Sequence, residues 1–124
     1  MFYSSITIEQ LNNSMNHCII QVMRPLHHPS RSEIKLTAVL YALSDITRLQ
    51  IVRQILTRDE LSCHAFEIST PKSTISHHFK VLRESGVTFT RVVGTQRFVS
   101  LRIEDLEARF PGLLDAIRVS SEPF

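Results

Sequence analysis

The chain has 124 residues, a length that suits one compact domain. Hydrophobic residues make up 43% of it, which is enough for a core, but no run approaches the roughly 18 apolar residues that a membrane-spanning helix needs. Residues 1–10 lack the basic segment and apolar run of a secretory signal, and Cys18 and Cys63 are too few for a disulfide framework. We therefore expect a cytoplasmic protein in a reducing compartment, with no membrane association.

The formal net charge is only +2, but the charges are unevenly distributed. Residues 72–102 contain six basic residues and one acid, Glu84, which gives this segment +5 and leaves −3 for the rest of the chain. The six basic residues are Lys72, Lys80, Arg83, Arg91, Arg97 and Arg102. Such a block is typical of a surface that binds a polyanion. A solvated face on which basic residues cluster by chance is the alternative that charge alone leaves open.

Three helices are predicted in the first half of the chain. Apolar residues recur at helical spacing over residues 8–23, and the prolines of the following linker forbid a continuous helix. Ser30 and Glu33 form a capping-box pattern, which predicts a second helix over residues 30–43. Asp45 can cap a third. Its inward-facing residues are expected to be Leu49, Val52, Ile55 and Leu56.

The second half of the chain changes its periodicity twice. A short helix is predicted over residues 61–68, and Thr70 is predicted to cap a longer helix that carries Pro71 in its first turn and ends at Gly86. Residues 87–93 and 97–102 are rich in β-branched and aromatic residues, which predicts a hairpin around Gly94 and Thr95. A final helix follows, kinked or split by Pro111. The expected fold is mainly α with a small β-hairpin, in the order helices, hairpin, helix.

The predicted helix over residues 71–85 has two different faces. Ile75, Phe79 and Leu82 form a narrow apolar stripe that must pack on the core. The opposite side carries Ser73, Ser76, His77, Lys80, Arg83 and Glu84. Hydroxyl groups can approach phosphates or base edges closely, lysine and arginine supply charge to phosphates, and arginine can also bind guanine. His78 lies at the edge of the stripe, where a structural role is favoured over base recognition.

The hairpin offers a second candidate contact to nucleic acid. Its turn lies between Arg91 and Arg97, and a hairpin tip of this kind can reach phosphates or the minor groove beside the helix. The alternative is a hairpin that only covers the core, and both roles can hold on different faces. The complete set of candidate DNA-binding residues is Lys72, Ser73, Thr74, Ser76, His77, His78, Lys80, Arg83, Arg91, Thr95, Gln96 and Arg97. An enzyme is not expected, because no paired carboxylates, phosphate-binding glycine loop or nucleophile motif occurs.

Two segments resemble the ArsR/SmtB family of bacterial transcriptional regulators. Residues 42–51, ALSDITRLQI, are similar to the family's LADPTRLRIL run, and residues 73–86, STISHHFKVLRESG, are similar to its STVSHHLKVLREAG recognition helix. The resemblance covers about residues 34–117. It implies a winged helix-turn-helix homodimer whose first and last helices form the interface. It also implies repression by occupancy of an operator, released by an inducer.

The resemblance also suggests how one domain, residues 1–124, is organised. Residues 1–30 would supply an N-terminal dimerisation helix and linker, residues 31–102 the DNA-binding core with its wing, and residues 103–124 a C-terminal dimerisation helix. A dimer would place two recognition helices in successive major grooves of a pseudo-palindromic double-stranded operator. The alternative function is a winged-helix module for protein interaction that has no DNA target of its own.

The sensing motifs of the family are missing. Its arsenic and lead sensors carry a Cys-Val-Cys-like motif, whereas residues 61–66 contain a single cysteine, and the last helix holds no histidine for a zinc site. Residues 63–66 and 109–116, CHAF and RFPGLLDA, instead resemble a subgroup with no ligand that this resemblance fixes. We therefore expect no metal site and no cofactor. Cys63 and its neighbour His64 are the candidate sensing residues. Three roles stay open for Cys63: a buried small hydrophobe with no sensing role, a redox-sensitive thiol, or one ligand of an intersubunit metal site with Cys18 or a histidine.

Overall fold

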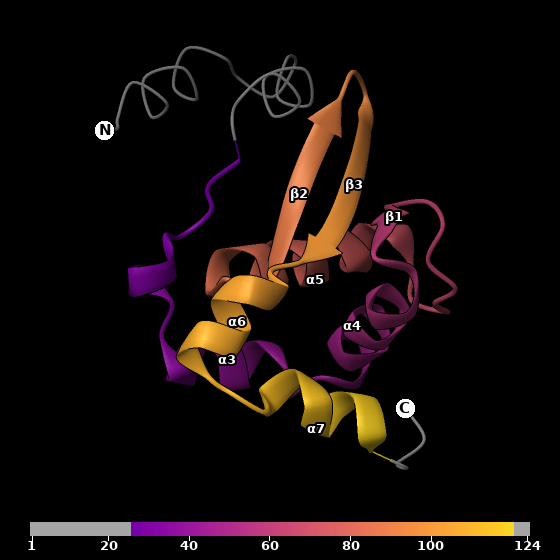
Figure 1. The fold of residues 1–124 in the computed structure, drawn as a ribbon. Coiled ribbons are helices and arrows are strands. Elements are labelled where there is room, and N and C mark those ends of the chain that lie inside the picture. Colours follow the sequence, from indigo (N-terminus) through magenta and orange to yellow (C-terminus); the bar gives the residue numbers. More distant parts are fainter. Residues whose placement is uncertain (1–25, 121–124) are drawn as a thin grey trace.

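The computed structural model describes residues 26–120, which form helices packed against a three-stranded sheet (Figure 1). The elements follow one another as η1 (Arg31–Glu33), α3 (Leu36–Ala42), α4 (Ile46–Arg58), β1 (Glu60–Ser62), α5 (Lys72–Ser85), β2 (Thr88–Val93), β3 (Gln96–Leu101), α6 (Ile103–Arg109) and α7 (Leu113–Val119). Within this part of the chain no helix is long and apolar enough to cross a bilayer. The helix predicted over residues 8–23 and Cys18 lie outside the described residues.

The hairpin of β2 and β3 projects away from the helices, and β1 joins it along one edge (Figure 1). All neighbouring strands are antiparallel, in the order β1-β3-β2. Val99 is buried at the centre, opposite Thr90 of β2 and Leu61 of β1. Gly94 adopts φ 62° in the tight turn, a left-handed conformation that suits glycine. The predicted hairpin and its turn are therefore confirmed.

The short helix predicted over residues 61–68 is wrong. Glu60–Ser62 is a strand, and an irregular loop follows it. Its backbone pairs with β3, with Glu60 opposite Ser100 and Ser62 opposite Phe98, and the Cys63 N–H extends the pairing by donating to the Arg97 carbonyl at 2.9 Å. A partner strand more than 30 residues away satisfies the backbone groups that a local helix would otherwise satisfy.

The helix predicted over residues 30–43 is split in two. The capping box forms, with the Ser30 N–H donating to Glu33 Oε1 at 2.8 Å, but it closes only the single turn of η1. Ile34 then takes an extended conformation and is 1% exposed. Its side chain lies so close to Gly86 that a Cβ there would be 2.6 Å from Ile34 Cγ1. We infer that this close packing between distant segments overrides the local helical pattern of the sequence.

The predicted cap of α4 and the predicted split of the last helical region agree with the structure. The Asp45 carboxylate accepts a hydrogen bond from the Arg48 N–H at 3.1 Å and caps α4, whose Val52 and Ile55 are buried while Leu49 and Leu56 are partly buried. At the C-terminal end, Pro111 lies between α6 and α7, so the last helix is split as expected. The core lies where α4, α5, β3 and these two helices meet.

The start of α5 differs by one residue from the prediction. Pro71 occupies the capping position rather than the first turn, and no side chain caps the helix. Thr70 was expected to cap it, but its hydroxyl lies 3.3 Å from that of Thr47 and connects the preceding loop to α4 instead. The end of the helix is as predicted, because Gly86 closes it in the left-handed conformation at φ 92°.

Candidate nucleic-acid interface

Helix α5 is attached to the core along one stripe and is open to solvent on the other. Phe79 is 9% exposed and Leu82 is fully buried, while Ile75 packs partly buried against the same cluster. The stripe predicted from the sequence is therefore confirmed. The side chains exposed on the remaining surface are Lys72, Ser73, Thr74, Ser76, His77, Lys80 and Glu84.

One buried arginine connects α5 to the helix before it. Arg48 of α4 is 6% exposed, and its guanidinium donates to the carbonyl oxygens of Ala42 at 2.6 Å and Tyr41 at 3.3 Å. Its third nitrogen lies 3.0 Å from His78 Nδ1. Since a guanidinium can only donate, Nδ1 accepts and the ring proton resides on Nε2. Arg48 thus connects α4 to α5 and to the end of α3 through satisfied buried polar groups.

Two of the candidate residues on α5 are not at its open face. His78 is 9% exposed and engaged with Arg48, which favours the structural role over base recognition. Arg83 is partly buried, and its Nε is enclosed without a hydrogen-bond partner in the described structure. Burial lowers the pKa of the Arg83 guanidinium, an effect that Glu84 opposes and Arg97 reinforces. Arg83 therefore faces inward along the helix rather than toward solvent.

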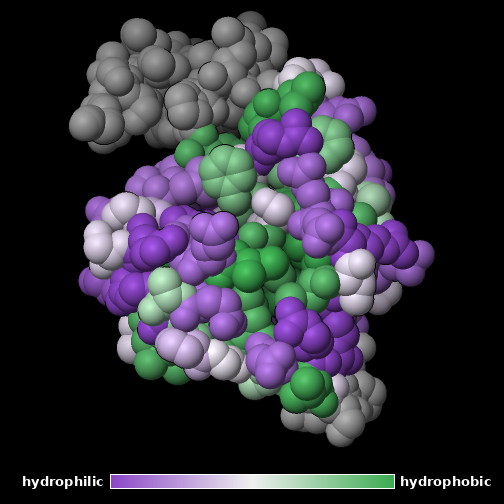
Figure 2. Space-filling model, viewed as in Figure 1, coloured by the Kyte–Doolittle hydropathy of each residue, from purple (hydrophilic) through white to green (hydrophobic). Residues whose placement is uncertain are grey.

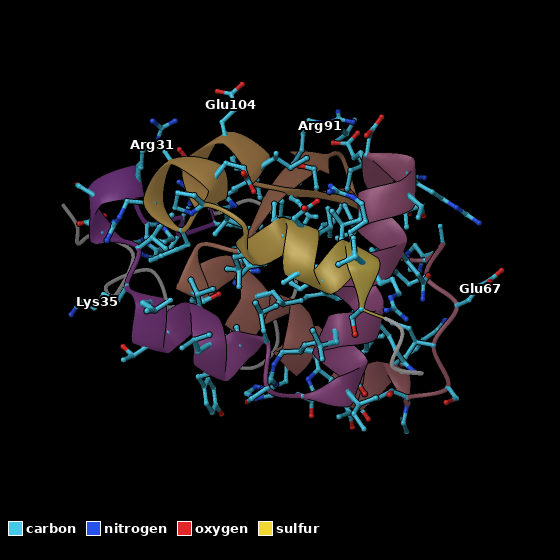
Figure 3. The ribbon with its side chains drawn as sticks, turned by 60° about the horizontal axis from the view of Figure 1, so that its bottom comes forward. Arg31, Lys35, Glu67, Arg91 and Glu104 are labelled. Atoms are coloured by element: carbon cyan, nitrogen blue, oxygen red, sulfur yellow. The ribbon has the colours of Figure 1, made fainter. Side chains whose placement is uncertain are left out.

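The wing, which we define as β2, β3 and the turn between them, exposes Thr95 and Gln96 at its tip. Arg91 is exposed too, but Glu60 of β1 accepts two hydrogen bonds from it, at 2.8 Å and 3.2 Å. The same guanidinium lies 4.7 Å from the centre of the Phe98 ring. Figure 3 shows Arg91 at the edge of the molecule. Glu60 was missed by sequence reasoning, because only the pairing of β1 with β3 brings it to the wing.

Arg102, the last residue of the basic segment, is also engaged. It donates to the Pro29 carbonyl at 2.6 Å and to the Asp105 carboxylate at 2.9 Å. Arg31 contacts the same carboxylate at 2.6 Å, and hydrogen bonds from Arg31 and then Arg102 hold the pKa of Asp105 below its usual value. Arg102 therefore connects the segment before η1 to α6. Because Asp105 compensates its positive charge, Arg102 contributes little to the attraction of an anionic ligand.

The candidate sensing residues sit beside the wing without forming a metal site. Cys63 is partly buried, and burial raises the pKa of its thiol despite the nearby Arg97 and Arg83, which act in the opposite direction. A raised pKa argues against an activated redox thiol and favours the buried small hydrophobe. His64 is exposed. Among residues 26–120, no three histidine, cysteine or acidic side chains are grouped so that they could hold a metal ion.

Comparison with known proteins identifies the family. Residues 39–87 match the family described as "Bacterial regulatory protein, arsR family". The chain is also 39% identical over 82 residues to an uncharacterized HTH-type transcriptional regulator, YceK, of Bacillus subtilis (strain 168), an alignment that covers 64% of this chain and 82% of the relative. The chain belongs to the ArsR family. The matched residues of this ArsR-family chain run from α3 through α4 to the end of α5.

Family membership agrees with the shape of the described structure. The mainly helical fold with a small antiparallel sheet is that of a winged helix-turn-helix, and the hairpin follows directly after α5. Both matches are to regulatory proteins, which are not normally enzymes. The ArsR-family chain is thus a DNA-binding regulator.

Proposed function

We propose that this chain is a homodimeric, sequence-specific repressor that acts in the cytoplasm, occupies a pseudo-palindromic operator and is released by a signal. In this proposal residues 31–102 form the DNA-binding core, while residues 1–30 and 103–124 form the dimer interface. The proposal depends most on one observation. Helix α5 is held to the core by its apolar stripe and presents a continuous exposed face of short hydroxyls, His77 and lysines.

The distribution of side chains along this face supports insertion into a major groove. Ser73, Thr74, Ser76 and His77 occupy the first half of α5, where short groups allow the backbone to come close to base edges. Lys72 and Lys80 are exposed and form no ion pair within the described residues. They can therefore neutralise phosphates on either side of the groove. Thr95 and Gln96 at the wing tip extend the same surface.

An apolar area on another face supports dimerisation. Figure 2 shows hydrophobic side chains gathered at the centre of the view, between α6 and α4 and below the hairpin. Val119 of α7 is 72% exposed and Ile103 of α6 is 45% exposed. Contiguous exposed apolar surface marks an interaction site more often than a free surface. To bind two half-sites of one operator, a second copy would have to hold its α5 about 34–36 Å from the first, one turn of DNA.

The test begins with selection of duplexes from a random library by the full-length protein, followed by anisotropy titration of a selected duplex. We expect an enriched inverted repeat, and sedimentation should show two protein chains per duplex. The double variant Lys72→Ala/Lys80→Ala should weaken binding at least tenfold and lower the slope of log K against log salt by about two per subunit, since each lysine releases counterions from one phosphate.

Lys35→Ala is the matched control. Lys35 is exposed, and Figure 3 places it at the opposite end of the molecule from Glu67, which precedes α5. This variant should bind the selected duplex as the unaltered protein does. Equal losses in the double variant and the control would contradict the assignment of the α5 face. A failure to enrich any sequence would contradict sequence-specific recognition and favour a protein-interaction module.

A further inference from the structure

A cavity of about 370 Å³ lies between α5, the loop that connects β1 to α5, and the wing. We call it the α5–wing cavity. Its size falls within the range of small-molecule sites. Three separate segments of the chain form its walls. Neither the family match nor the relative assigns it a role.

Part of the cavity lining is apolar and aromatic. The rings of Phe66 in the loop and Phe79 in α5 lie 5.2 Å apart at an interplanar angle of 59°. Ile68 and Ile75 flank them, and both are partly buried against the hydrophobic core. Two tilted rings between aliphatic side chains suit a flat apolar group better than a polar one.

The cavity lining also carries positive charge. Arg83, Arg97 and Lys72 line the cavity, and its lining includes no aspartate or glutamate. Arg83 Nε is completely enclosed and has no hydrogen-bond partner in the described structure. Within residues 26–120, Arg83 and Arg97 form no ion pair with any carboxylate. Burial makes an anionic partner more favourable for a cation, and the partly buried Arg83 and Arg97 have no ion-pair partner within the described residues.

The walls are held in place independently of any ligand. The side-chain amide of Gln54 in α4 donates to the Glu67 carbonyl and accepts from the Glu67 N–H, both at 3.0 Å. This pair of hydrogen bonds fixes the loop that carries Phe66 and Ile68. On the other side, the Cys63 N–H donates to the Arg97 carbonyl and ties the start of the loop to the wing. The cavity is therefore formed before a ligand enters, which lowers the entropic cost of binding.

From these features we infer that the α5–wing cavity binds a small organic anion with an apolar body, of which an aromatic carboxylate is the simplest kind. Its carboxylate would lie against Arg83 and Arg97, and its ring against Phe66 and Phe79. The cavity also includes Lys72, Ser76 and Thr95, which belong to the proposed DNA-binding surface. Occupation should therefore weaken DNA binding, and this second statement rests on the proposed function.

The binding test uses full-length protein and three probes, titrated by protein-observed NMR without DNA. Benzoate supplies both the anion and the ring, benzamide is its neutral isostere, and inorganic phosphate supplies charge without an apolar body. We expect saturable binding of benzoate, with benzamide and phosphate at least tenfold weaker, because a hydrogen bond to a charged partner contributes about one order of magnitude in affinity.

Three variants locate the site. Arg83→Gln and Arg97→Gln should each weaken benzoate binding about tenfold, and Arg97, on the wing, gives a second test if Arg83→Gln fails to fold. Lys80→Gln removes a charge from the same helix at an exposed position outside the cavity, so it should leave benzoate binding unchanged while weakening DNA binding. Benzoate should also raise the Kd for the selected duplex in the unaltered protein.

Several results would overturn the inference. Equal affinity for benzamide and benzoate would mean an apolar cavity in which the arginines play no part. Equal affinity for phosphate would mean a clamp for the DNA backbone alone. Absence of saturable benzoate binding would also refute it. Benzoate binding that leaves the duplex affinity unchanged would refute only the coupling, and failure to select any duplex would refute the proposed function while leaving the cavity result intact.

Discussion

The basic residues around α5 and the wing tip differ in their partners from those around α6 and α7. Near α6 and α7, Arg31 and Arg102 share the carboxylate of Asp105, and Arg118 pairs with Asp115. On α5, by contrast, the lysines form no ion pair within the described residues. Both regions are rich in arginine and lysine, so the number of basic residues does not distinguish them. What distinguishes a polyanion-binding surface is the charge that the fold leaves unpaired.

The same difference divides the basic residues of segment 72–102, whose net charge is +5, into paired and unpaired groups. Arg91 and Arg102 are engaged by Glu60 and Asp105, so their charges are largely compensated within the protein. The remaining cations fall into two pairs: Lys72 and Lys80 are exposed on α5, whereas Arg83 and Arg97 are partly buried. The first pair suits phosphates of DNA, and the second suits a ligand in the cavity that Arg83 and Arg97 line.

The largest effect on stability is expected at Asp105. Asp105→Asn removes the carboxylate that pairs with Arg31 of η1 and with Arg102 at the start of α6, so the free energy of unfolding should fall by about 1 kcal/mol. Because the pKa of Asp105 is lowered in the folded state, its contribution is present at neutral pH and is lost as the pH falls through the folded pKa. Urea denaturation at pH 7 and at pH 3 measures both statements.

Asp115→Asn is the control for this prediction. Its pair with Arg118 is exposed, with side chains 70% and 53% accessible, and exposed pairs contribute little. Binding of the selected duplex by folded Asp105→Asn should be unchanged. If Asp105→Asn weakened DNA binding as much as the α5 lysine variant does, the distinction between paired and unpaired regions would fail.

A smaller effect is expected from releasing a paired cation on the wing. Glu60→Gln removes the charge that holds Arg91, so the guanidinium becomes available to a phosphate and one acid is lost from the vicinity of DNA. We expect the duplex affinity to rise by about twofold to fivefold and the salt dependence to become slightly steeper. The anisotropy titration measures this directly. The double variant Glu60→Gln/Arg91→Gln should lose the gain, and retention of it would show that Arg91 is not responsible.

Another prediction concerns His28, which joins the segment before η1 to the wing. Its Nε2 accepts a hydrogen bond from the Thr90 N–H at 3.0 Å, and its ring stacks on Phe89 with centres 4.4 Å apart. Burial, then Arg83 and Arg102, lower the pKa of His28 to about 4. Since this is below the unfolded value of 6.5, the unfolded state binds more protons between these values, so stability should fall as the pH drops from 7 to 5.

His28→Gln provides the comparison, because glutamine offers an acceptor but does not titrate. Thermal unfolding at pH 7 and pH 5 should show a smaller decrease in Tm for this variant than for the unaltered protein. An identical decrease in both would place the pH dependence elsewhere. His28 is not among the proposed DNA-binding residues, so binding of DNA at pH 7 should not change.

Features that depend on neighbouring residues were predictable from the sequence. Asp45 caps the helix that follows it, Gly86 ends α5, and the hairpin turns at Gly94, because each of these residues acts on the backbone next to it. The two errors in the helices have a common cause. The strand β1 depends on a partner in β3, and the break at Ile34 depends on Gly86, more than 50 residues away.

The same distinction applies to the candidate site. The polar and apolar faces of α5 follow from helical spacing, so Ile75, Phe79 and Leu82 were placed correctly. The partners of the arginines could not be predicted, because the ion pair of Glu60 with Arg91 spans 31 residues and the hydrogen bond of Arg31 with Asp105 spans 74. Nor does spacing indicate that Arg83 and Arg97 would share a cavity.

The buried guanidinium of Arg48 has a consequence for how DNA can be released. Because this side chain of α4 bonds to the Ala42 and Tyr41 carbonyl oxygens of α3 and to His78 of α5 at once, it ties the three helices together. Tilting α5 alone would leave a buried cation without its acceptors, which is costly. For the proposed dimer, we therefore expect a releasing signal to change the spacing between the two subunits or to block the groove between α5 and the wing, rather than to tilt α5 alone.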